Sequence, residues 1–175
     1  MSELPDRISR AFADHDSFEP APVPGRYRHV GTSFDAVVDV STDGETVLLD
    51  VRVRVPMLDE VASERVADVI EDGWYETFER RAVDVDGVTK LEREASPSVR
   101  RSVDEEGTRV AVVEVTIEDS VPRRGVEDAG AIVDYLEGTY VLGVVPGYEY
   151  GEPVSELISR ARAAGSSGNG SLDLE

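Results

Sequence analysis

The middle of the chain largely alternates between apolar and polar residues, in two runs joined by a short turn. Apolar side chains occupy every second position in 34–40 and again in 47–55. Asp43-Gly44 lies between the runs, and this dipeptide is typical of tight hairpin turns. The pattern therefore predicts an antiparallel β-hairpin with one face in the core and a mostly polar face in water.

Elsewhere the apolar spacing changes from two residues to three or four, which is the period of an amphipathic helix. Leu4, Ile8 and Phe12 show it near the N-terminus. Pro56 ends the second strand of the hairpin, and a longer helical pattern follows it, in which Gly73 could kink or stop the helix. The predicted helices span about 5–14, 58–81 with its break at Gly73, 128–137 and 153–164.

Three further segments complete the predicted fold. The proline-rich stretch 19–25 should be an extended connector. Residues 91–103 form a weaker strand that contains Pro97, which favours an edge position, and 110–118 form a regular strand. We expect an α+β fold, an antiparallel sheet of about four to five strands with helices packed on one face, in the order helix-ββ-helix-ββ-helix. Residues 1–164 should form one domain and 165–175 a flexible tail.

The charge balance is strongly acidic. The formal net charge is −19 at pH 7, and a single lysine accompanies seventeen arginines. A dispersed acidic excess with almost no lysine resembles the proteins of salt-accumulating haloarchaea. In molar salt the Debye length falls to about 3 Å, so repulsion between the carboxylates is screened. In dilute buffer the same repulsion should destabilise the compact state. Nucleic acid is not an expected partner, because phosphate binding needs positive surface.

Composition also removes several kinds of site. The chain has no cysteine and two histidines, which excludes thiolate chemistry and argues against a zinc or iron–sulfur centre. No apolar stretch is long enough to span a bilayer, and the N-terminus lacks the apolar core of a signal peptide. We expect a cytoplasmic protein with no membrane partner, no cofactor and no metal. Asp14-His15-Asp16 and Asp84-Val85-Asp86-Gly87 are better explained by a helix end and a turn than by ligand sets.

An aromatic segment rich in glycine, 138–151, is the most distinctive part of the chain. It contains Tyr140, Tyr148 and Tyr150, and its spacing matches neither a phosphate-binding loop nor a dinucleotide fingerprint. Either it is a tight structural crossing whose tyrosines close the core, or it is a binding surface. Trp74 has the same two interpretations, a core anchor or an exposed contact for a partner.

Arginines occur in pairs, and Arg52 and Arg54 should share one face of a strand. Two neighbouring guanidinium groups could hold a carboxylate or a phosphate. Alternatively, they pair with the surrounding acids, which are twice as numerous as the basic residues. No catalytic motif is found.

Two stretches, 73–81 and 137–150, resemble a haloarchaeal family of unknown function, and the resemblance extends to about residue 164. It implies no activity. The element order is separately similar to secretion-chaperone-like folds, which bind partner proteins as dimers. We therefore predict a salt-adapted, non-enzymatic protein-interaction or chaperone-like module, whose partner is another protein or a second copy in a homodimer. The alternative is a small anionic-ligand binder or hydrolase that uses the paired arginines.

Overall fold

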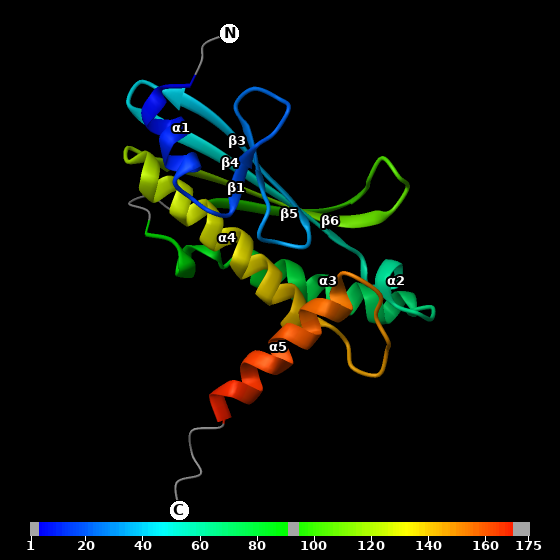
Figure 1. The fold of residues 1–175 in the computed structure, drawn as a ribbon. Coiled ribbons are helices and arrows are strands. Elements are labelled where there is room, and N and C mark those ends of the chain that lie inside the picture. Colours follow the sequence, from blue (N-terminus) through cyan, green and yellow to red (C-terminus); the bar gives the residue numbers. More distant parts are fainter. Residues whose placement is uncertain (1–3, 91–94, 170–175) are drawn as a thin grey trace, which may run out of the picture.

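The computed structural model describes residues 4–90 and 95–169 and shows an α+β fold built on one antiparallel sheet (Figure 1). In the described residues the sheet has six strands in the order β1-β2-β3-β4-β6-β5. Every neighbouring pair is antiparallel. The strands are β1 (Phe18–Pro20), β2 (Arg26–His29), β3 (Asp35–Asp43), β4 (Thr46–Pro56), β5 (Ser96–Val103) and β6 (Arg109–Asp119).

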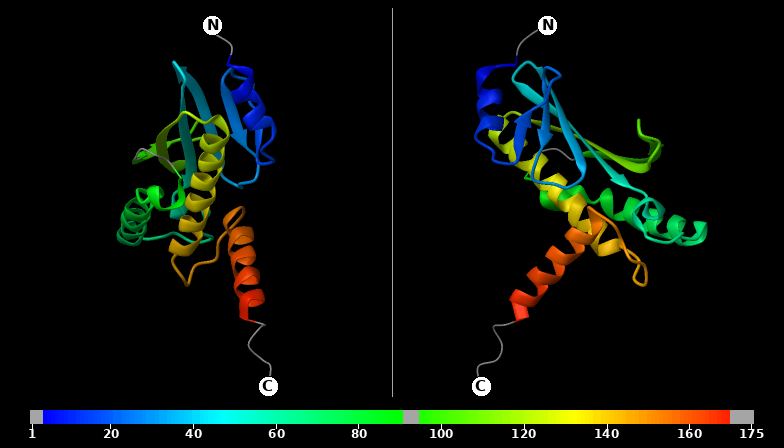
Figure 2. Two further views of the ribbon diagram at one scale, coloured as in Figure 1. Left: turned by 90° about the vertical axis from the view of Figure 1, so that its left-hand side faces the viewer. Right: turned by 45° about the vertical axis from the view of Figure 1, so that its right-hand side comes forward.

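Helices pack on one face of this sheet (Figure 2). The longest helix, α4, runs across strands β4 and β6, and α1 and α3 lie against α4. The helices are α1 (Asp6–Ala13), α2 (Leu58–Val61), α3 (Asp68–Ala82), α4 (Pro122–Gly143) and α5 (Val154–Asn169), with a 3-10 turn η1 (Val85–Val88) after α3.

The apolar positions of the strands meet the helices in a continuous core. Leu49 and Val51 of β4 are fully buried, as are Ile132 and Leu136 of α4. Helix α4 approaches the sheet closely at Gly125, where an added Cβ would lie 2.9 Å from Leu49 Cδ1. A side chain at this position would require the end of the Leu49 side chain to shift.

The central hairpin is confirmed, and its turn contains Gly44 with a φ of 62°. The expected number of strands was too low. The first residues of the proline-rich stretch 19–25 belong to a short strand, β1, and a second short strand, β2, follows the stretch. The two strands pair with each other and extend the sheet beyond β3. A three- or four-residue strand contains too few alternations to be seen in a sequence, and its partner supplies the hydrogen bonds that hold it.

Three predicted element boundaries also differ from the structure. The helix expected to start at residue 58 is only one turn, α2, and a separate helix α3 runs without a break through Gly73. Helix α4 begins at Pro122 and continues to Gly143, well beyond the predicted 128–137. Packing against the sheet holds it helical across Gly130 and Gly138, although glycine lowers helix propensity. The edge strand β5 begins at Ser96, and 91–94 lie outside the described residues.

Helix α5 points away from the body of the protein (Figure 2). Its first turns are anchored by Val154 and Leu157, which are 0% and 3% exposed. The helix was expected to end near residue 164 but runs to Asn169. Residues 170–175 of the predicted tail lie outside the described residues.

Candidate functional site

The second face of the sheet carries no helix among the described elements, and its side chains form rows across the strands. In one row, Val37 of β3 faces Arg52 of β4, which faces Glu114 of β6. In the next, Asp35 faces Arg54, which faces Val112. We call this surface the open face of the sheet.

Arginines of the open face are bound to carboxylates of neighbouring strands. Glu114 accepts hydrogen bonds from Arg52 Nε and Arg100 Nη2, both at 3.2 Å. Burial opposes ionisation of Glu114, but these two guanidinium groups outweigh it and hold the pKa of the carboxyl below its ordinary value. Arg54 Nη1 donates to Asp35 Oδ2 at 3.1 Å. The open face is therefore a network of opposite charges rather than a free cationic surface.

One carboxylate of this network, that of Asp50, lacks such an arginine partner among the described residues. Asp39 is held by a bidentate contact with Arg26, at 2.7 and 3.1 Å, while Asp50 lies directly across the strand pair from Asp39. The Oδ1 atom of Asp50 is buried and has no hydrogen-bond partner among the described residues. Burial first, and then the negative charge of Glu114, raise the pKa of Asp50 above its ordinary value.

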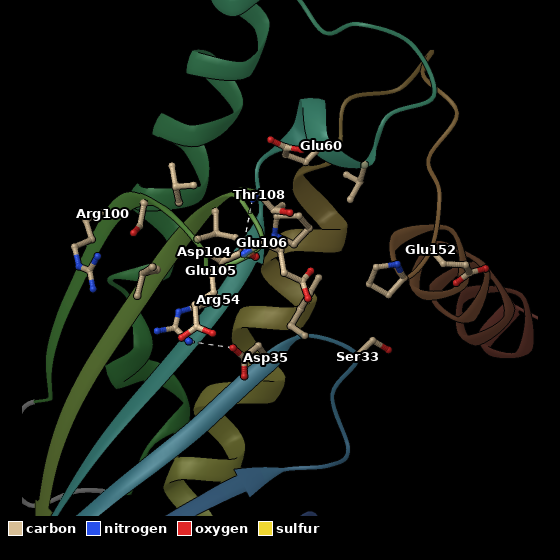
Figure 3. Close-up of a pocket in the computed structure, with 18 residues that line it drawn as sticks. Ser33, Asp35, Arg54, Glu60, Arg100, Asp104, Glu105, Glu106, Thr108 and Glu152 are labelled. Atoms are coloured by element: carbon tan, nitrogen blue, oxygen red, sulfur yellow. Dashed lines mark hydrogen bonds and ion pairs between the residues drawn. The ribbon is translucent and has the colours of Figure 1, made fainter.

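A groove of about 820 Å³ lies at one end of the open face (Figure 3). Its floor contains Val110 and Val112 of β6, which are 5% and 1% exposed although they belong to the open face by register. Two arginines, Arg54 and Arg100, line it together with six acids. The acids are Asp35, Glu60, Asp104, Glu105, Glu106 and Glu152.

The rim of this groove is the tip of the β5–β6 hairpin, and a carboxylate holds the tip in place. Asp104 Oδ1 accepts the backbone N–H groups of Glu106 and Thr108, each at 2.9 Å. Gly107 takes a φ of 85°, which suits glycine. Because Asp104 is used within the turn, the side chains that the tip presents to the groove are Glu105 and Glu106.

Two of the predicted binding residues, Trp74 and Tyr140, lie in the core. Trp74 is 4% exposed and stacks on Phe78 with ring centroids 5.7 Å apart. Tyr140 is fully buried, packs edge-on against Trp74, and donates its hydroxyl to the Pro56 carbonyl at 2.9 Å. Burial also raises the pKa of the Tyr140 hydroxyl. These contacts are those of a structural anchor in the core, the first of the two interpretations given above for both residues.

Tyr148 and Tyr150 lie in the connection between α4 and α5, and both are partly buried. Tyr150 donates its hydroxyl to the Val145 carbonyl and forms an isolated bridge with Ala62. The structure thus separates the tyrosines from Arg52 and Arg54, and no tyrosine lines the groove among the described residues. Of the six predicted residues, only Arg54 lines it.

Sequence reasoning missed the groove, although one signal for it was present. After Arg109, strand β6 has four apolar residues in a row, Val110 to Val113, which breaks the alternation seen in its second half. The additional apolar residues are the groove floor. The acids of the walls come from segments that are far apart in the chain, so their convergence leaves no local pattern.

The acidic motifs considered from the sequence are structural. His15 follows α1, and its Nδ1 accepts the backbone N–H of Ser17 at 3.2 Å. The stretch around Asp86 is the 3-10 turn η1, and Asp86 Oδ1 accepts the backbone N–H of Ala95 at 2.9 Å. Within residues 4–90 and 95–169, no group of three or more potential metal ligands is found. No described helix combines the length and apolarity required to cross a bilayer.

Fold and site together define a small α+β protein with one helix-covered and one open sheet face. The chain belongs to a protein family described as a family of unknown function, DUF5813, which matches residues 13–160. The predicted membership of a family of unknown function is therefore confirmed, while the haloarchaeal origin stays a prediction. No curated protein and no solved structure matches the chain.

Proposed function

We propose that this protein is a non-enzymatic interaction module that binds a partner protein on the open face of its sheet. The observation that carries the proposal is the groove of about 820 Å³ with its buried apolar floor of Val110 and Val112. A sheet face with an apolar depression inside a polar surround has the anatomy of a protein-binding surface. Salt adaptation belongs to the same proposal and rests on the net charge of −19.

The second candidate function is binding or hydrolysis of a small anionic ligand held by paired arginines. The contacts that these arginines make within the protein disfavour it. Arg52 and Arg100 share Glu114, and Arg54 is bound to Asp35. An anion would have to displace these carboxylates and enter a groove lined by six acids and two arginines. Like-charge contact of this kind costs free energy, so an anion is disfavoured.

The absence of cysteine allows a direct test of the proposal. Ser102, which lines the groove, is changed to cysteine and labelled with a benzophenone maleimide. The matched control is Glu76→Cys on the exposed side of α3. Both proteins are irradiated in lysate of the source cells at high salt, and crosslinked products are identified by mass spectrometry.

We expect a partner protein that crosslinks from Ser102→Cys and not from Glu76→Cys, and that binds the purified wild-type chain on reconstitution. Equal products from both positions, or none from either, would overturn the proposal. Turnover of a small molecule that depends on Arg52 and Arg54 would favour the second candidate instead.

A further inference from the structure

We infer that the groove docks an extended segment of a partner protein that carries arginine or lysine beside an apolar side chain. This inference rests on the proposed function and names the chemistry of the partner. It is argued from the charges that the groove leaves unpaired, from its apolar floor and from the charge of the whole chain.

The negative charge of the groove is only partly neutralised within the protein. Asp35 is bound to Arg54, and Glu60 accepts the backbone N–H of Arg109 at 3.1 Å and contacts its guanidinium. Glu105 and Glu106, in contrast, have no side-chain hydrogen bond or ion pair among the described residues. They reach the groove from the hairpin tip, so a cation placed there gains new pairing without displacing an existing one.

Glu152 adds a third carboxylate from the connection before α5. Its Oε1 accepts the Ser155 hydroxyl at 2.9 Å, and among the described residues it forms no ion pair. Figure 3 shows Glu152 and the hairpin-tip glutamates on separate segments around the groove. An extended segment that lies along the groove could therefore meet carboxylates from two parts of the fold.

The floor of the groove favours an apolar neighbour of that basic residue. Val110 and Val112 close the base of the groove. The apolar surface open to a partner comes from the partly exposed Pro56 of β4 and from Val103 of β5, which is 60% exposed. Burial of an apolar side chain on this floor is not screened by salt, unlike the ion pairs of the rim. A segment that combines both kinds of side chain would therefore stay bound at the salt concentrations for which the chain is suited.

The charge of the whole chain argues against a second copy as the occupant. Two copies would each bring a net charge of −19, and the chain has a single lysine. Two copies would bring carboxylates against carboxylates at contact distance, where salt screens least, whereas a basic segment would meet the same carboxylates with opposite charge. Charge complementarity thus selects a basic segment of another protein.

The test measures binding of fluorescein-labelled peptides to the full chain by fluorescence anisotropy. The main probe has arginines flanked by valines between Gly-Ser ends. In the two control probes the arginines are replaced by glutamine or by glutamate. Each titration is run at about 2 M KCl and at the lowest KCl concentration at which circular dichroism shows the chain still folded, so that screening differs between the two.

The decisive variant combines Glu105→Gln, Glu106→Gln and Glu152→Gln. Its matched control, Glu64→Gln with Glu76→Gln and Glu79→Gln, removes the same charge from exposed positions outside the groove. We expect the arginine probe to bind the wild type and the control alike and to bind the groove variant about tenfold more weakly. Circular dichroism of all three proteins shows whether each is folded.

Several outcomes would overturn the inference. One is equal binding of the arginine probe to both variants. Another is stronger binding of the glutamine or glutamate probe than of the arginine probe. A third is binding of spermine, a polyamine without apolar side chains, as tight as that of the arginine probe. A concentration-dependent dimer in sedimentation that the Ser102→Cys label abolishes would make a second copy the occupant. If the partner found by crosslinking binds the groove variant as tightly as the wild type, the inference fails and the proposed function stands. If no partner is found, both the inference and the proposed function fail.

Discussion

The two faces of the sheet are built from alternate residues of the same strands, yet they are held by different forces. On the covered face, Leu49 and Val51 are fully buried against helix α4. On the open face, Arg52 and Glu114 lie in neighbouring register positions and stay partly exposed, with side-chain exposures of 23% and 31%. Apolar burial stabilises the first face by up to about 3 kcal/mol per large side chain, and exposed ion pairs stabilise the second by less than about 1 kcal/mol each.

The difference indicates a division of labour within one sheet. The covered face holds the protein folded, so its residues tolerate little change. Apart from the buried Val110 and Val112, the open face contributes little to stability, so its charges and its groove are available for binding. Changes matched across the two faces test this division.

The largest expected effect is the loss of the fold when salt is removed. With a net charge of −19, self-repulsion grows as screening falls, while the covered face is unaffected by ions. We expect circular dichroism to report unfolding on dilution from about 2 M KCl, before about 0.15 M is reached. A far-ultraviolet spectrum that is unchanged at low salt would contradict the salt adaptation.

Neighbouring leucines allow a direct comparison of the two faces. Leu49 is fully buried on the covered face, and Leu48 lies on the open face and is partly exposed. We expect Leu49→Ala to lower the free energy of unfolding by about 2–5 kcal/mol, and Leu48→Ala to lower it by about 1 kcal/mol or less. Urea titration at constant KCl measures both, because urea adds no ions. Equal losses would show that both faces carry the core.

A buried and an exposed glutamate provide a similar comparison for ion pairs. Glu71 has a side-chain exposure of 5%, contacts Arg109 Nη1 at 2.7 Å, and accepts the backbone N–H of Asp59 at 2.8 Å. Because Glu71→Gln leaves these donors with a weaker acceptor in a buried position, we expect a loss of about 2 kcal/mol. Glu114→Gln on the open face should cost less than about 1 kcal/mol in the same urea titrations. The opposite order would contradict the division of labour.

The smallest expected effect is a gain of stability at Asp50. Its raised pKa means that the fold disfavours the ionised carboxylate, so its stability contribution falls as the pH rises above the ordinary value of about 4. Asp50→Asn should therefore unfold at a higher urea concentration than the wild type near pH 7, and the difference should shrink as the pH approaches about 4. Asp39→Asn, directly across the strand pair, removes the bidentate contact with Arg26 and should not stabilise.

Much of the fold could be predicted from local pattern. The alternation in 34–55 predicted the central hairpin, and the helical spacing predicted α1 nearly to its ends and the start of α5. Prediction was less accurate where an element depends on its neighbours. Helix α4 continues through Gly138 because its buried face rests on other elements, and β1 exists because β2 supplies its hydrogen bonds.

The candidate site was predictable only in fragments. Arg52 and Arg54 were expected to share a strand face, and they do, but their acidic partners come from β3 and β6. Trp74 and Tyr140 are 66 residues apart in the numbering of the chain, yet their rings are 5.4 Å apart. An exposed aromatic and a buried one look the same in a sequence, since burial depends on what the rest of the chain brings against it.

The amino-acid sequence by itself determined the acidic surface, the absence of thiol chemistry and the alternation that makes one sheet face apolar. Composition and period are local properties, and they act wherever the residues are placed. Only the tertiary structure decided which carboxylates lose their partners and where a groove forms. Glu105, Glu106 and Glu152 line the same groove although they come from the β5–β6 hairpin and from the connection before α5, two segments far apart in the chain. Such long-range convergence depends on how the elements pack, and no local pattern records it.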